Sequence, residues 1–198
     1  MSTTARPSGA RPVDSLVSQG GYTGVVRHYP IAASYGTAIF EGDFVKRVTT
    51  GVVEKDTVTT VLAAGHIGIF LGCQYTDPTT GQFTNSNQWP ASNAATDAVA
   101  FVADDPFIIF RMQASATVAA SSLGLNIKGI NTAGDTNIGR SKNALDGASE
   151  ATTNSFPFRI IGFVEDGANT AGDTYTDLIL MYAPGTATLH HNLSPLGL

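Results

Sequence analysis

Charged side chains are scarce in this sequence. They make up 14% of its 198 residues, whereas about 25% is usual in soluble domains. The 11 Lys and Arg are outnumbered by 16 Asp and Glu, which gives a formal net charge of −5. Nucleic-acid binders carry clustered basic residues, so this balance argues against direct binding of nucleic acid. A surface with so few charges is poorly protected against association. We therefore expect copies of the chain, or another protein, to cover much of it.

Cysteine and long apolar runs are also nearly absent. Cys73 is the only cysteine, so no intrachain disulfide forms, and synthesis in a reducing compartment is expected. The longest apolar stretch, residues 61–73, is too short to span a bilayer and contains His66. The opening MSTTARPSGARPVD has no apolar segment of the kind found in secretory signals. We expect neither a membrane-embedded protein nor one exported by a classical route.

Helical periodicity is weak, and short β-like runs alternate with turn residues instead. Turn signals recur about every 8–12 residues, as is typical of sandwiches and barrels. The sequence therefore predicts an all-β fold, a small β-barrel or sandwich of short antiparallel strands that occupies residues 25–198. The predicted strands cover residues 37–40, 44–48, 52–55, 58–62, 67–75, 82–84, 98–103, 107–113, 125–130, 158–165 and 176–182.

Two segments lack any such pattern. Residues 1–24 are rich in Ser, Thr and Gly, which predicts an extended N-terminal arm that orders only against a partner. Arg6 and Arg11 are the only charges among the first 13 residues, so this arm is basic while the body is acidic. Residues 139–155 are polar, which predicts a long surface loop or an excursion that contacts a partner.

The hexamer NTAGDT occurs twice, at residues 131–136 and 169–174. In each copy Asn can begin a turn, and Gly can supply the left-handed position that ends it. A four-residue loop that closes a hairpin fits both copies, with Asp-Thr starting the returning strand. A calcium loop needs about 6–8 oxygen ligands, usually with several carboxylates, and each hexamer offers one. The hexamer therefore indicates turns rather than a duplicated binding site.

Local signatures of catalysis are missing. No G-x-S-x-G motif is present, and Cys73 lies in a strand-like apolar run, where a small core residue is expected. Neighbouring residues of a strand point to opposite faces, so Asp104-Asp105, followed by Pro106, is predicted to form a hairpin turn. An enzyme whose carboxylates meet only on folding is an alternative, but the sequence favours a protein that is not an enzyme.

No cofactor or metal site is predicted either. The Gly-rich segments lack the G-K-[ST] ending of a phosphate-binding loop. His190-His191 has no third ligand at a recognisable spacing and is expected in an exposed tail. Aromatic residues near loops favour an interface or core cap, with a sugar-binding platform as the alternative; they are Tyr22, Tyr29, Tyr35, Tyr75, Phe83 and Trp89.

The first half of the chain resembles a known class of protein. GTAIFEGDFVKRVTTGVVEK at residues 36–55, followed by GHIGIFLGCQYTDPTTGQ at residues 65–82, resembles the head decoration (cement) proteins of tailed bacteriophages. GGYTGVVRHYPIAASYGTAIFEGDFVK and TDPTTGQFTNSNQWPA are also similar to virion proteins of marine tailed phages. In the second half, I-G-F-V at residues 161–164 echoes I-G-I-F at residues 67–70. The chain is longer than the smallest decoration proteins.

This resemblance implies a structural virion protein without enzymatic activity. Such proteins assemble as trimers on the outer face of the capsid and bridge neighbouring subunits of the major capsid protein. It thus implies a homo-oligomer, a trimer, on the virion surface after synthesis in the host cytoplasm. Arg6 and Arg11 would pair with acidic groups of the capsid protein. The expected capsid or subunit contacts are Arg6, Arg11, Tyr22, His28 and Tyr29.

Two other structural roles are alternatives. A tail or head-fibre component would bind host glycans through the aromatic loops. A tail-tube subunit would also be a β-rich oligomer. A major capsid protein of the common phage fold needs a long helix, and the sequence predicts none.

Overall fold

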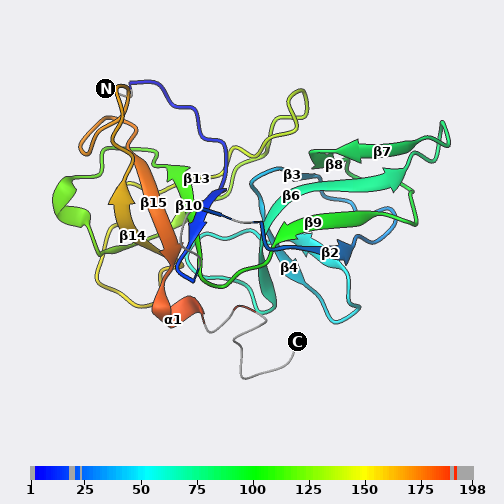
Figure 1. The fold of residues 1–198 in the computed structure, drawn as a ribbon, viewed down its shortest axis with the longest axis horizontal. Coiled ribbons are helices and arrows are strands. Elements are labelled where there is room, and N and C mark those ends of the chain that lie inside the picture. The colour runs from blue at the N-terminus through cyan, green and yellow to red at the C-terminus, as the bar shows by residue number, and fades with distance from the viewer. Residues whose placement is uncertain (1–2, 18–20, 23, 188–189, 191–198) are drawn as a thin grey trace.

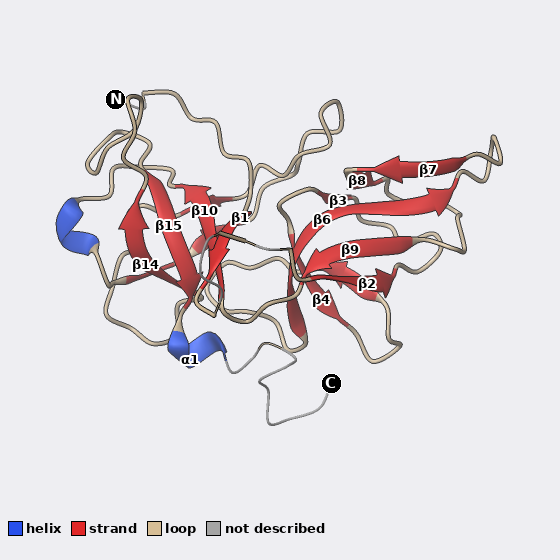
Figure 2. Cartoon of the chain, viewed as in Figure 1, coloured by secondary structure: helices blue, strands red, loops and turns tan. Residues whose placement is uncertain are grey.

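The computed structural model describes residues 3–17, 21–22, 24–187 and 190 (Figure 1). The described chain consists of strands and loops (Figure 2), with a short 3₁₀ turn, η1 (Ala120–Ser122), and one short helix, α1 (Pro184–Ala187). All pairings between its named strands are antiparallel. The all-β, antiparallel fold class predicted from the sequence is confirmed. The two larger sheets lie side by side in Figure 1.

The first sheet has five strands in the order β1-β10-β15-β14-β11. It combines the beginning and the end of the chain, because β1 pairs with β10 and the remaining strands follow β10 in sequence. A two-stranded ribbon, β12 with β13, lies beside β10. The strands are β1 (Arg11–Ser15), β10 (Ile108–Gln113), β11 (Asn126–Ile127), β12 (Gly129–Ile130), β13 (Ala144–Leu145), β14 (Phe158–Phe163) and β15 (Asp177–Tyr182).

The second sheet has the order β2-β9-β6-β4-β5, with β7 also paired to β6. Ile31, directly after β2, forms a bridge with Val53 of β5, so the two ends of this order meet and the sheet curls toward a barrel. A short ribbon of β3 and β8 completes this half. The strands are β2 (Val26–Pro30), β3 (Ile39–Phe40), β4 (Phe44–Arg47), β5 (Val53–Lys55), β6 (His66–Thr76), β7 (Phe83–Ser86), β8 (Gln88–Trp89) and β9 (Val99–Ala103).

Two apolar clusters form the core. One fills the curled second sheet and includes Trp89 and Phe70, both fully buried. The other lies between the sheets, where Phe44 of β4 stacks on Phe158 of β14 with ring centroids 5.1 Å apart. Apolar residues at alternate positions of β10, such as Phe110, point into this second cluster. Burial of these faces joins the two sheets into one body.

The predicted free arm is wrong for part of residues 1–24. Arg11–Ser15 forms β1, an integral edge strand of the first sheet, and Ala10 is 1% exposed within the core. The N–H of Ala10 also donates to the carbonyl oxygen of Gly42, at 2.9 Å. Sequence reasoning missed this strand because Pro12 and Asp14 interrupt its apolar alternation. Residues 1–2, 18–20 and 23 of the predicted arm lie outside the described residues.

Most predicted strands occur within a few residues of their expected ends. Residues 58–62 do not form one, although Val58 and Leu62 are buried in the core. Residues 125–130 form two short strands, β11 and β12, instead of one. Strands β1, β2, β8 and β13 were not predicted; each is short or lacks continuous β-branched residues.

The predicted surface loop at residues 139–155 is also corrected. It contains β13, and three of its side chains are almost fully buried: Ser141 at 1% exposure, Asn143 at 4% and Leu145 at 0%. Its polar residues misled the prediction because Ser141 and Asn143 both hydrogen-bond the buried carboxylate of Asp43. A polar side chain can be buried when it has such a partner.

The two NTAGDT copies adopt different conformations. The second lies in the connection between the paired strands β14 and β15, and its Gly172 has the expected left-handed φ of 87°. The first opens the longer excursion between β12 and β13; its Gly134 has no positive φ and packs against the ring of Phe40. Neither copy is a simple four-residue hairpin loop. One hexamer thus forms two structures, because the surrounding chain decides the conformation.

Cys73 is confirmed as a core residue. It lies in β6, is 0% exposed, and burial raises the pKa of its thiol to about 12. At pH near 8 the native thiol is therefore protonated as well as inaccessible, and the thiolate is the reactive species. We expect Ellman's reagent to leave the native protein unmodified over the time in which the urea-unfolded chain reacts fully. Cys73→Ala gives the zero-thiol baseline; fast stoichiometric reaction of the native protein would contradict this placement.

Candidate functional site

A cleft of about 800 Å³ lies along the β1 side of the first sheet. Its walls come from the N-terminal residues 3–11, from β10 and β15, and from the loops at residues 138–142 and 168–169. Five of the chain's 11 Lys and Arg line it, whereas Asp177 is the single acidic residue among the described lining. This acidic protein therefore carries a basic cleft. The five basic residues are Arg6, Arg11, Arg111, Arg140 and Lys142.

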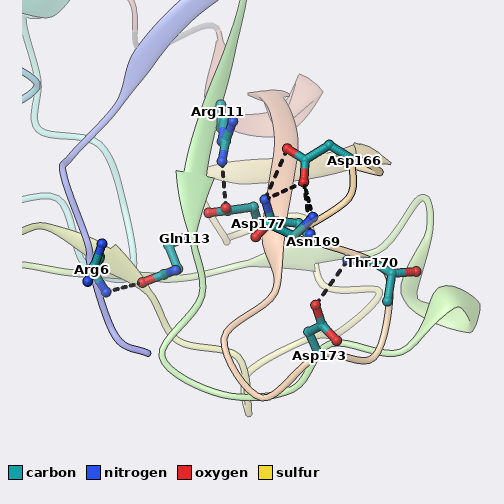
Figure 3. Close-up of polar contacts among 9 residues, drawn as sticks. Arg6, Arg111, Gln113, Asp166, Asn169, Thr170, Asp173 and Asp177 are labelled. Atoms are coloured by element: carbon teal, nitrogen blue, oxygen red, sulfur yellow. Dashed lines mark hydrogen bonds and ion pairs between the residues drawn. The ribbon is translucent and has the colours of Figure 1, made fainter. Parts of the chain in front are cut away.

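Strand register places two of these arginines side by side. Arg11 of β1 lies directly opposite Arg111 of β10, so both side chains project from the same face of the sheet. Arg111 is partly neutralised by Asp177, whose Oδ2 accepts from its Nη2 at 2.6 Å (Figure 3). No acidic side chain of the described chain lies within ion-pair distance of Arg11. The Arg11–Arg111 pair thus has one carboxylate partner among the described residues, and this partner binds Arg111.

Arg6 is held in the cleft by its backbone. Its N–H donates to Oε1 of Gln113 at 2.6 Å, which ties the N-terminal segment to the end of β10 (Figure 3). The side chain of Arg6 is exposed, and no carboxylate of the described residues pairs with it. The guanidinium group is therefore free to contact a ligand without loss of the bond that positions residue 6.

Arg140 and Lys142 come from the excursion between β12 and β13. Their side chains are 47% and 46% exposed. Nζ of Lys142 lies 3.1 Å from Oδ2 of Asp135, and this contact, together with the N–H of Asn137, lowers the pKa of Asp135. Arg140 is only loosely paired, with 3.9 Å between its Nε and Oε2 of Glu41. Exposed ion pairs of this kind are weak, so both cations remain available.

The far wall contains the second NTAGDT copy. Nδ2 of Asn169 donates to both carboxylate oxygens of Asp166, at 3.0 and 3.1 Å, and the N–H of Thr170 donates to Asp173 at 3.0 Å (Figure 3). The N–H of Ala168 and these Asn169 contacts lower the pKa of Asp166. The turn residues therefore use their carboxylates to hold the wall, not to bind a cation.

The side chains that line the cleft are suited to binding an anion. Its described lining holds no His or Cys, and the Ser141 hydroxyl donates to buried Asp43 instead of facing a base. What it offers is guanidinium and ammonium groups, the donors that recognise carboxylates and phosphates. A smaller hollow of about 180 Å³, next to Ser8, Arg11 and Arg140, extends it toward the second sheet.

The structure separates the five residues predicted as contacts. Arg6 and Arg11 come together in the cleft, while the others lie elsewhere. His28 is exposed on β2, with its ring centroid 4.9 Å from that of Phe101. The hydroxyl of Tyr22 donates to the carbonyl oxygen of Val25 at 2.7 Å, and Tyr22 packs partly against the core.

Tyr29 is not a surface residue. It is 9% exposed, and its hydroxyl donates to the buried carboxylate of Asp104. Burial, together with this hydrogen bond and charge, raises the pKa of Tyr29 to about 12. The expected contact role of Tyr29 is therefore corrected to a structural one inside the protein.

Asp104-Asp105 does not form the predicted hairpin turn. It carries the chain from β9 in the second sheet to β10 in the first, and both residues are buried, at 1% and 7% exposure. Oδ2 of Asp105 accepts from the hydroxyl of Ser15 at 2.5 Å, and Asp104 pairs with Arg27 at 3.2 Å. The two carboxylates thus join the sheets from within and do not form a catalytic pair in a cleft.

A second buried polar group lies beside them. Nδ1 of His66 is 2.8 Å from Oδ2 of Asp56, and Nε2 is 2.9 Å from the hydroxyl of Tyr182. His190 is fully buried against these rings, with Nε2 3.4 Å from Oδ1 of Asp104, so the prediction of an exposed tail is wrong for this residue. His191 lies outside the described residues. Burial hides the Asp-His-Tyr arrangement from any substrate, which favours a structural role.

Sequence reasoning missed Arg111, Arg140 and Lys142. Each is far from Arg6 and Arg11 in the chain, and only strand pairing and the path of the excursion bring them together. Of the aromatic residues considered for a sugar platform, Trp89, Tyr75 and Tyr29 are buried, whereas Phe83 is 63% exposed. No local sequence signal shows which basic residues line the cleft or which aromatic residues are buried.

Other kinds of site find no support among the described residues. Within them, no group of three or more His, Cys, Asp or Glu side chains is arranged to hold a metal ion. No helix in the described part of the chain is long and apolar enough to cross a membrane. Comparison with models of known protein families finds no match, and no curated protein or solved structure matches the chain.

Proposed function

We propose that the chain is a structural virion protein that binds the outer face of a phage capsid and stabilises it by bridging subunits of the major capsid protein. The observation that carries this proposal is the basic cleft, which unites Arg6 and Arg11 of the N-terminal segment with three further cations on an acidic protein. The resemblance of residues 36–55 and 65–82 to decoration proteins also supports a capsid-binding role.

Charge distribution supports binding to an acidic protein surface. A chain with a formal net charge of −5 is repelled by such a surface as a whole. A local group of five cations overcomes this repulsion at one place and orients the approach. The remaining surface, with few charges, is then available for contacts between copies of the chain in a homotrimer. Several such attachments on one trimer would bind with avidity, because each raises the effective concentration of the next.

We propose no catalytic activity. The cleft combines cations with a turn whose backbone N–H groups are held by Asp166, and no nucleophile next to a base is found in its described lining. Binding of anionic side chains requires only cationic hydrogen-bond donors such as guanidinium and ammonium groups, whereas acyl or glycosyl transfer requires a positioned acid or base.

Co-sedimentation with undecorated phage heads tests the proposal. We expect a trimer by light scattering that pellets with heads, and an Arg6→Gln, Arg11→Gln variant whose affinity for heads falls at least about tenfold, since one lost charge-assisted contact is worth about 1.5 kcal/mol or more. Point variants are preferable to truncation at residue 24, which would remove β1 from its sheet. Lys46→Gln, which removes a cation of β4 outside the cleft, is the control. A monomer that does not pellet with heads would overturn the proposal.

A further inference from the structure

We infer that the cleft binds the carboxylates of an extended acidic protein segment, with the Arg11–Arg111 pair at its centre. This deepens the proposed function, on which it rests for the origin of that segment in the capsid protein. The ligand class follows from the donors that the cleft presents and from their arrangement, not from the resemblance.

The central observation is a juxtaposition that is unfavourable without a ligand. Arg11 and Arg111 lie directly opposite each other on β1 and β10, and like charges at such positions destabilise a sheet. Asp177 offsets one of the two guanidinium groups. A carboxylate bound between them would relieve the remaining repulsion and accept hydrogen bonds from a planar, fork-shaped donor. A bound anion would therefore stabilise a pair whose repulsion the free protein only partly offsets.

The other cations come from separate walls of the cleft. Arg6 belongs to the N-terminal segment, whereas Arg140 and Lys142 belong to the excursion on another wall. Arg6 is exposed, and the side chains of Arg140 and Lys142 are about half exposed. Separate cations along an open cleft of about 800 Å³ match carboxylates spaced along a peptide. A single phosphate would instead require several donors converging on one position.

The walls are held in place before any ligand binds. The bond from the N–H of Arg6 to Gln113 fixes one wall, and the carboxylates of Asp166 and Asp173 fix the turn on another. On the third wall, Ser141 is anchored to buried Asp43 at 2.7 Å. A prearranged site loses little conformational entropy on binding, so a short acidic segment is sufficient as a ligand.

The test uses the full chain and a short fluorescein-labelled peptide of alternating Glu and Gly, followed by fluorescence anisotropy. We expect saturable binding that weakens as salt rises and about tenfold weaker binding for Arg11→Gln, which removes one charge-assisted contact. Arg11→Lys, which keeps the charge but not the planar fork, should be intermediate. Lys46→Gln matches the loss of one charge outside the cleft and should bind like the unaltered protein.

Stability supplies a second readout of the same site. Arg11→Gln removes the cross-strand repulsion, so its melting temperature should equal or exceed that of the unaltered protein in buffer. Saturating peptide should raise the melting temperature of the unaltered protein more than that of the variant. A marked loss of stability on Arg11→Gln, together with unchanged peptide affinity, would overturn the inference by making Arg11 a structural residue.

The outcomes separate this inference from the proposed function. Peptide binding that needs Arg11, without any binding to heads, would support the acidic-segment site and overturn the capsid role. If Arg11→Gln binds heads as tightly as the unaltered protein, the capsid role would be supported and the acidic-segment site would be overturned. Displacement of the peptide by inorganic phosphate at an equal or lower concentration would overturn the carboxylate assignment, because the site would then prefer a compact anion.

Discussion

Replacement of Asp43 by alanine should lower the free energy of unfolding by about 3–5 kcal/mol, the range found when one partner of a buried ion pair is removed. Asp43 is fully buried, and Nζ of Lys55 lies 2.9 Å from its Oδ2. The same carboxylate accepts from the N–H of Phe40 at 3.0 Å, from Ser141 at 2.7 Å and from Asn143 at 3.0 Å. Its loss would leave a buried cation and three donors without their acceptor.

Urea unfolding followed by circular dichroism measures this effect. Asp43→Asn should be less harmful than Asp43→Ala, because the amide oxygen still accepts some of these bonds while the charge is lost. Combining Asp43→Asn with Lys55→Met should recover part of the loss, since the uncompensated cation is also removed. Glu54→Ala, which removes the carboxylate next to Lys55 on β5, is the control. Its free energy of unfolding should stay within about 0.5 kcal/mol of that of the unaltered protein. Equal stability of Asp43→Ala and the control would contradict the role of Asp43.

Asp43 also connects the core with the cleft. Through Ser141 and Asn143 it fixes the segment that carries Arg140 and Lys142. Asp43→Asn should therefore weaken binding of the acidic peptide even when the protein remains folded. Asp43 belongs to residues 36–55, one of the stretches that resemble decoration proteins, so this stretch contains a residue that stabilises the fold.

Replacement of Gly68 by alanine should be about as damaging, with an expected loss of about 3–5 kcal/mol from backbone strain and overpacking together. Gly68 has φ of 150° and lies where the register between β4 and β6 shifts. A Cβ at this position would overlap the carbonyl oxygen of Ala103, which belongs to the backbone and has no flexible end to move. The neighbouring Asp104 begins the crossing between the two sheets, so the disturbance would reach their junction.

Gly51→Ala is the matched control for Gly68→Ala. Gly51 also has a positive φ, 87°, but nothing lies within 4 Å of a Cβ added there. Both variants carry the conformational cost of a side chain at positive φ, about 1 kcal/mol or somewhat more, and this cost is greater at the φ of Gly68. The difference between their unfolding free energies therefore reports the overlap with Ala103 together with this additional backbone strain. If the two variants lose the same stability, close packing at Gly68 is not what requires glycine.

Local residue patterns were sufficient for the fold class and for most strands. β-Branched and aromatic runs such as residues 67–75 favour a half-buried extended chain wherever they occur, so β6 was predicted almost to its ends. The same local logic placed Cys73 in the core. It failed for β1, whose pairing with β10 compensates for a weak local preference.

Residue order was enough to predict the all-β class, the core position of Cys73 and a basic N-terminal segment with Arg6 and Arg11. It did not predict that Arg11 lies opposite Arg111, that Arg140 and Lys142 line the same cleft, or that His190 and Asp104 are buried together. Strand preference depends mainly on each residue and its near neighbours in the chain. Charge pairing and burial of polar groups depend instead on residues that are far apart in the chain until strand pairing brings them together.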